Sequence, residues 1–147
     1  MLKKPLSDSG TCWLNSRTAI GVHCKDGVLL GADKLVEQNM IIPESDHRVY
    51  NVTLQNGMVG CGWMPDARHI IYRARAEAKG YVDNFGMKIP GHVLANKMGH
   101  FVHMHTQYGL YRPFGAAIIM ANWDELRGYS LYMIEPSGQT LVISNLS

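Results

Sequence analysis

The sequence predicts an α+β fold in a single domain of 147 residues. Three observations support this class: β-rich runs separated by turn signals come first, two helical patterns follow, and strand patterns return near the end. Segregated strands and helices are typical of α+β proteins, whereas parallel α/β folds alternate the two. Apolar residues make up 46% of the chain, which is enough to build one buried core.

The first predicted strands form a hairpin. Residues 18–24 and 28–32 are β-rich, and Asp26-Gly27 between them is a strong hairpin signal. We expect residues 1–17 to be an irregular and partly disordered leader, so the domain itself covers residues 18–147.

The next segment predicts further strands. Residues 35–42 are expected to be extended up to Pro43, and residues 44–47 are predicted to form a turn. A second hairpin is predicted from residues 48–54 and 58–61, with Asn56-Gly57 as its turn.

Two helices are predicted in the middle of the chain. The first begins at Pro65 and buries residues at helical spacing, namely Ala67, Ile70, Ile71, Ala74 and Ala78. The second begins near Pro90 and ends near Gly109, with one face formed by Leu94, Met98, Phe101, Val102 and His105. Strand patterns return at residues 116–121, 129–134 and 140–143, with a turn at Pro136-Ser137-Gly138.

Composition excludes several classes of function. Fourteen Lys and Arg against twelve Asp and Glu give a net charge of +2, too small for a protein that binds a phosphate backbone, so nucleic acid is not an expected partner. Apolar runs such as residues 115–121 are far shorter than the roughly 20 residues that cross a bilayer, so no membrane contact is expected. Because Cys12, Cys24 and Cys61 form no Cys-x-x-Cys pair, we predict free, mostly buried thiols in a reducing compartment.

Histidines on the second predicted helix raise the question of a metal. His100, His103 and His105 are spaced so that the three rings do not share one helical face, and no Glu accompanies them as in the zinc motif His-Glu-x-x-His. We expect no metal and no cofactor, with His105 in the core. A metal-dependent hydrolase built on these histidines is kept as an alternative.

Five segments, taken together and in order, resemble the alpha-type subunits of the 20S proteasome. They are Thr18-Ala19-Ile20-Gly21-Val22, Cys24-Lys25-Asp26-Gly27-Val28-Leu29-Leu30-Gly31, Pro65-Asp66-Ala67-Arg68, Arg112-Pro113-Phe114-Gly115 and Tyr132-Met133-Ile134-Glu135-Pro136-Ser137-Gly138. The resemblance implies the N-terminal nucleophile (Ntn) hydrolase fold, an αββα sandwich that is incomplete at the C-terminal end here. The chain also departs from the family at residues 1–17, which lack a recognisable gate-forming segment.

The same resemblance implies a subunit without catalytic residues. In the beta-type relatives a free N-terminal threonine is the nucleophile, and alignment of the first strands places Arg17 at that position. Asp33 and Arg48 correspond to the acidic residue and the lysine of the active relatives. A beta-type threonine protease that uses Thr18 is the alternative.

The implied role is structural. The chain would take a place in the alpha ring beside other alpha subunits, beta subunits and a regulatory particle or activators, and would serve ATP- and ubiquitin-dependent protein degradation in the cytoplasm and nucleus. Arg48 is the candidate for docking the C-terminal carboxylate of activators, because arginine binds carboxylates with two parallel hydrogen bonds. Arg112, Pro113, Phe114 and Gly115 are expected to be structural, with Phe114 in the core and Gly115 allowing close backbone approach. A truncated paralogue that does not assemble is a further alternative.

Overall fold

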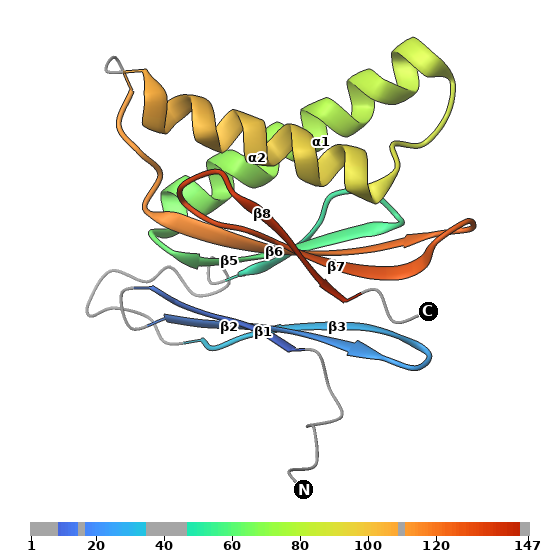
Figure 1. The fold of residues 1–147 in the computed structure, drawn as a ribbon, viewed down its shortest axis with the longest axis horizontal. Helices are drawn as coiled ribbons and strands as arrows, with labels where there is room; N and C mark the ends of the chain where they lie inside the picture. The colour runs from blue at the N-terminus through green and yellow to red at the C-terminus, as the bar shows by residue number, and fades with distance from the viewer. Residues whose placement is uncertain (1–8, 15–16, 35–46, 109–110, 145–147) are drawn as a thin grey trace, which may run out of the picture.

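The computed structural model describes residues 9–14, 17–34, 47–108 and 111–144, which form three layers (Figure 1). A three-stranded antiparallel sheet has the order β1-β2-β3, from β1 (Ser9–Leu14), β2 (Arg17–Cys24) and β3 (Gly27–Ala32). A five-stranded antiparallel sheet has the order β4-β5-β6-β7-β8, from β4 (Val49–Asn51), β5 (Asn56–Gly62), β6 (Ala116–Asp124), β7 (Gly128–Ile134) and β8 (Thr140–Ser144). The predicted α+β class is therefore confirmed.

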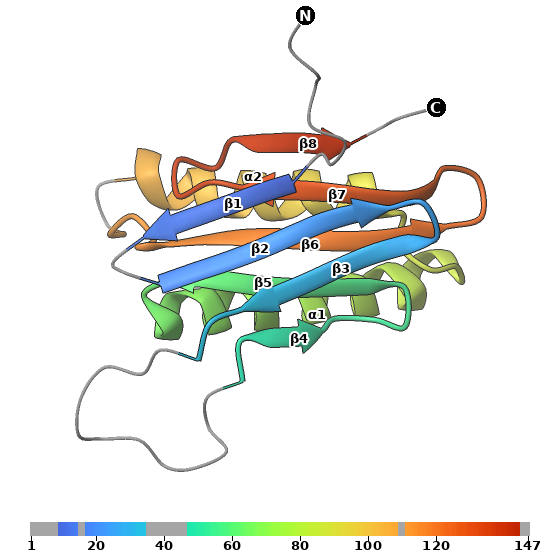
Figure 2. The same cartoon turned by 90° about the horizontal axis from the view of Figure 1, so that it is seen from below.

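The five-stranded sheet is the middle layer. Helices α1 (Met64–Phe85) and α2 (Gly91–Gln107) cover one of its faces, and the smaller sheet covers the other, with its strands running obliquely across those beneath (Figure 2). Neither of these helices is long and apolar enough to cross a membrane, and no other helix occurs in the described ranges.

Strand β6 shows why the middle sheet is buried on both faces. Successive side chains of a strand point to opposite faces. Ile118 and Met120 pack in the cluster beneath the helices. Ala117 and Ile119 pack in the cluster between the two sheets. Burial on both faces explains why residues 116–121 read as a continuous apolar run and not as an alternation.

Both predicted hairpins form, but the second turn differs from its prediction. Strands β2 and β3 pair around Lys25 and Asp26, as the Asp-Gly signal indicates. In the second hairpin Asn56 and Gly57 lie inside β5, opposite Asn122 and Ala121 of β6, and not in the turn. Thr53 makes the turn instead, because its Oγ1 accepts hydrogen bonds from the backbone N–H groups of Gln55 and Asn56, both at 3.1 Å.

The two helices follow the predicted pattern closely. The five predicted residues of α1 are buried, and α1 ends at Gly86, whose φ of +68° suits glycine. In α2, Leu94, Met98 and Val102 are fully buried, whereas Phe101 and His105 are only partly buried at the edge of the core. The apolar stripe therefore fixes which face of each helix meets the sheet.

The predicted irregular leader is wrong for residues 9–14. These residues form β1, which pairs antiparallel with β2 from Ser9 opposite Val22 to Leu14 opposite Arg17. The run from Ser9 to Leu14 has no clear alternation of polar and apolar residues, so its strand arises from pairing with the edge of β2. Residues 1–8 and the predicted segments 35–42 and 44–46 lie outside the described residues.

The prediction of free, buried thiols is also wrong. Cys61 is buried but disulfide-bonded. Cys24 is free but exposed, and the side chain of Cys12 lies outside the described part of the chain. Cysteine spacing could not reveal the bond, because disulfide formation depends on proximity in the fold and not on distance along the chain.

Candidate functional site

Asp33 and Arg48 form an ion pair that joins the two sheets. Asp33 directly follows β3, and Arg48 directly precedes β4 in the other sheet. The Nη1 of Arg48 donates to the carbonyl oxygen of Asp33 at 2.8 Å and pairs with its carboxylate Oδ1. The carbonyl of Arg48 accepts the N–H of Gly60 in β5 at 3.3 Å. The Arg48 side chain is 6% exposed and that of Asp33 is 32% exposed, so the guanidinium is the more deeply buried partner.

Thr18 belongs to the same cluster but not as a nucleophile. Its backbone N–H donates to Oδ2 of Asp33 at 2.9 Å. Thr18 lies inside β2, after Arg17, which pairs with Leu14 of β1. An N-terminal threonine nucleophile needs its own free amine as the base, whereas this nitrogen is a peptide N–H. The structure brings together Thr18, Asp33 and Arg48, in an arrangement unsuited to acyl transfer by Thr18. The side chain of Arg17 lies outside the described residues.

A second cluster links the start of α1 to the start of β6. Arg112 donates to both carboxylate oxygens of Asp66, from Nη1 to Oδ2 at 2.7 Å and from Nη2 to Oδ1 at 2.6 Å. The N–H of Gly115 donates to Oδ2 of Asp66 at 2.9 Å, and the N–H of Trp63 donates to the carbonyl of Gly115 at 2.8 Å. The segments Pro65–Arg68 and Arg112–Gly115, noted separately in the sequence, are therefore bonded to each other.

Hydrogen bonding lowers the pKa of Asp66. The hydrogen bond from Arg112 is the largest of the effects that hold the pKa of Asp66 below its ordinary value of 3.8; burial raises the pKa, and the bond from Gly115 lowers it further. Asp66 also lies in the first turn of α1, where the helix dipole favours a negative charge.

We expect Asp66→Asn to lower the free energy of unfolding by about 1–2 kcal/mol at neutral pH, because an amide cannot accept both bonds from Arg112. A lowered carboxyl pKa contributes stability that is present above the unfolded value of 3.8 and is lost as the pH falls through the folded value. The difference between wild type and variant should therefore shrink in acid. Urea unfolding across the acid range checks this, with Asp83→Asn, an exposed carboxylate on the same helix, as the control. A difference independent of pH would contradict it.

The segment Arg112–Gly115 also completes the core beneath α2. Phe114 is 6% exposed, and its ring lies 4.4 Å from that of His105 and 5.6 Å from that of Phe101, measured between centroids. The reason predicted for Gly115 needs correction, since a Cβ there would be 3.5 Å from the Cβ of Trp63, an ordinary van der Waals distance. Gly115 approaches α1 through backbone hydrogen bonds, and the lack of a side chain is not required for that approach.

The three histidines of α2 lie in different surroundings. The Nδ1 of His103 is 3.0 Å from the carbonyl oxygen of Ser137, and the Nδ1 of His105 is 2.9 Å from that of Phe101. His100 lies on the outer side of the helix, beside Phe101 and Met104. Among the residues that the structure describes, no group of three or more His, Cys, Asp or Glu side chains is placed to hold a metal ion.

Comparison with known proteins gives a consistent result. The family model for proteasome subunits matches residues 14–144. The chain is 41% identical over 124 residues to proteasome subunit alpha type-3 of Spinacia oleracea, and 42% identical over 124 residues to that of Dictyostelium discoideum. It is 40% identical to the probable proteasome subunit alpha type-7 of Schizosaccharomyces pombe. Each match covers 84% of this chain but 49–50% of the relative, so the chain spans about half the length of the curated relatives it matches.

Proposed function

Because this chain belongs to the proteasome subunit family, we propose that it is a non-catalytic, alpha-type subunit of the 20S core. The observation that carries the proposal is the cluster around Asp33. Its carboxylate is paired with Arg48 and also accepts the peptide N–H of Thr18, where a threonine protease would need a free amine. The names of the relatives, all alpha-type, support the same conclusion.

The finer architecture that we propose is the Ntn sandwich with helices outside both sheets. The outer face of the small sheet supports this proposal, because Ile20 is 43% exposed and Leu29 is 65% exposed on neighbouring strands. Apolar side chains on an open sheet face gain stability when another layer covers them. In the complete assembly we propose that a further helical layer covers this face.

Arg48 is proposed to receive the C-terminal carboxylate of an activator protein. Its Nη1 is occupied by Asp33, but its Nη2 is buried and has no hydrogen-bond partner among the described residues. A buried N–H group without a partner is unfavourable, so an incoming carboxylate oxygen would satisfy it. The docking role thus uses Nη2, the guanidinium nitrogen that the pair with Asp33 leaves without a hydrogen-bond partner.

The proposed partners are other alpha subunits, beta subunits and a regulatory particle or activator. Within such an assembly the chain would contribute contacts and shape to ATP- and ubiquitin-dependent protein degradation, in the cytoplasm and nucleus. The interactions that it supplies would be structural, since the pair of Asp33 and Arg48 ties its own sheets together.

The test is assembly of the full chain in its own cells. We expect a tagged copy to elute in gel filtration with other alpha and beta subunits in a very large particle, as identified by mass spectrometry. Thr18→Ala should leave the peptidase activity of that particle unchanged, because Thr18 is not a nucleophile. Loss of activity in Thr18→Ala would favour the beta-type alternative. A wild-type chain that elutes alone or aggregated would overturn the assembly proposal and favour a paralogue that does not assemble.

A further inference from the structure

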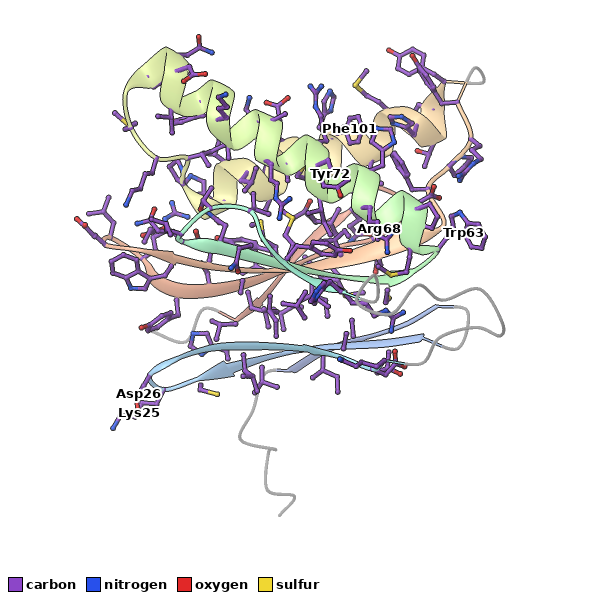
Figure 3. The ribbon with its side chains drawn as sticks, turned by 180° about the vertical axis from the view of Figure 1, so that it is seen from behind. Lys25, Asp26, Trp63, Arg68, Tyr72 and Phe101 are labelled. Carbon is purple, nitrogen blue, oxygen red and sulfur yellow. The ribbon has the colours of Figure 1, made fainter. Side chains whose placement is uncertain are left out.

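The core between the two sheets opens into a slot at one end of the molecule. The slot has a volume of about 310 Å³ and lies where the β2–β3 hairpin, with Lys25 and Asp26 at its tip, faces the β6–β7 hairpin (Figure 3). Val28 and Leu30 of β3 line it from the small sheet, and strands β4 to β7 line it from the middle sheet. The slot is lined by different residues from the cluster around Asp33.

Small side chains leave this slot open. In the filled part of the core Val59 lies opposite Ile119, and both are buried. Two residues further along the same strands, and on the same face of the sheet, Gly57 lies opposite Ala121. Leu30 of the small sheet faces this pair, since a Cβ on Gly57 would be 3.4 Å from its Cδ1. The slot is therefore the place where the side chains of the middle sheet become too small to fill the space between the sheets.

Trp123 and Tyr129 form an aromatic wall of the slot. They lie directly opposite each other on β6 and β7, and each is 39% exposed. Trp123 is two residues beyond Ala121, so its ring is on the same face of the sheet. Aromatic rings pack against other rings in offset or edge-to-face arrangements. This wall therefore favours a ligand that carries a ring.

The slot has no charged lining. Among the described residues that form it, none is Asp, Glu, Lys, Arg or His, and its polar side chains are amides and a hydroxyl. Asn51 lies opposite Gly57, which places its amide on the side of the slot. An amide both donates and accepts hydrogen bonds. A charged ligand would lose its hydration here without gaining an ion pair, whereas an uncharged polar group can bond to the amide.

We propose that the slot binds a small uncharged molecule, which places one planar ring above Gly57 and Ala121 and presents an amide or hydroxyl group to Asn51. The volume of the slot is at the lower end of the range of small-molecule sites, which is about 300–1,000 Å³, so it suits a ligand with a single ring. The inference goes beyond the proposed function, since neither assembly nor Arg48 enters it.

Three probes of nearly the same shape test the proposal. Benzamide is uncharged, benzoate is an anion, and benzamidine is a cation at neutral pH. Each is added to the isotope-labelled full chain, and the backbone amide signals are followed by NMR. We expect benzamide to shift the signals of Leu30, Gly57 and Ala121 until they saturate, with a Kd on the order of 1 mM. Benzoate and benzamidine should bind at least about tenfold more weakly, because the slot offers neither of them an opposite charge.

Three variants locate the binding. Ala121→Val fills the slot and should abolish the shifts caused by benzamide. Gly31→Val adds a side chain on the outer face of β3, where a Cβ meets nothing within 4 Å, and should leave binding unchanged. Tyr129→Ser removes part of the aromatic wall without filling the slot, and should weaken the binding of benzamide roughly threefold.

Several results would overturn the proposal: no saturable binding of benzamide, equal binding of the three probes, shifts confined to residues outside the slot, or an affinity for benzamide that Ala121→Val does not change. The same spectra show whether each variant is folded, so loss of the ligand is distinguished from loss of the fold. Co-elution with other subunits is scored separately, so the proposed function and this ligand site can fail independently.

Discussion

Replacing Gly138 by alanine is expected to lower the free energy of unfolding by about 3 kcal/mol or more. Gly138 has a φ of +88° in the turn between β7 and β8, a backbone conformation that residues with a Cβ rarely adopt. A Cβ at this position would also lie 2.5 Å from the backbone nitrogen of His103 and 2.4 Å from its Cβ. The turn and α2 would have to separate, which also disturbs the contact between His103 and the carbonyl of Ser137.

Two control variants separate backbone strain from collision with α2 as causes of this loss of stability. Gly128→Ala introduces the same kind of strain, because its φ is +68°, but a Cβ there meets nothing within 4 Å; we expect a loss of about 1 kcal/mol. Gly115→Ala introduces neither strain nor collision and should be close to neutral. Urea unfolding of the three variants gives the comparison. If Gly138→Ala and Gly128→Ala lower the free energy of unfolding equally, collision with α2 does not contribute to the effect of Gly138→Ala.

Most of the architecture could be predicted from the sequence because its elements carry strong local signals. The Asp26-Gly27 turn predicts the first hairpin, and the alanine-rich stripe of α1 predicts which face packs on the sheet. The features that the sequence did not predict share a different cause. Strand β1 depends on pairing with β2, and the disulfide bond at Cys61 depends on which cysteine the fold brings close to it. Such features follow from contacts that are distant in the sequence, so local patterns do not show them.

The functional clusters divide in the same way: local motifs identify the residues, and only the fold shows which of them meet. The motifs predict an alpha-type proteasome subunit, similar to alpha type-3 through segments such as Lys25-Asp26-Gly27 and Asn84-Phe85-Gly86, and the relatives bear this out. The contact between Asp66 and Arg112 was not predicted, although both residues lie in noted motifs. An acidic residue in the first turn of a helix and an arginine before a strand were the available signals, and only the fold shows that they meet.

In the ion pair of Asp33 and Arg48, which joins the two sheets, removing the carboxylate should cost more stability than removing the guanidinium. Asp33→Ala would leave the guanidinium of Arg48, 6% exposed, without its carboxylate, and we expect a loss of about 3–5 kcal/mol. Arg48→Met keeps an apolar side chain of similar length at the buried position. It leaves Asp33, 32% exposed, in reach of water and still bonded to the N–H of Thr18. We therefore expect Arg48→Met to cost only about 1 kcal/mol.

The double variant Asp33→Ala with Arg48→Met decides whether this asymmetry has the proposed cause. If the cost of Asp33→Ala is the desolvated charge left behind, removing that charge should restore most of the stability, so the double variant should be more stable than Asp33→Ala alone. A double-mutant cycle by urea unfolding measures the coupling directly. Additive losses would mean that Asp33 stabilises the junction through its bonds to backbone, not through Arg48. Because the guanidinium is buried, the coupling should also change little with salt, unlike that of an exposed pair such as Arg73 and Glu77.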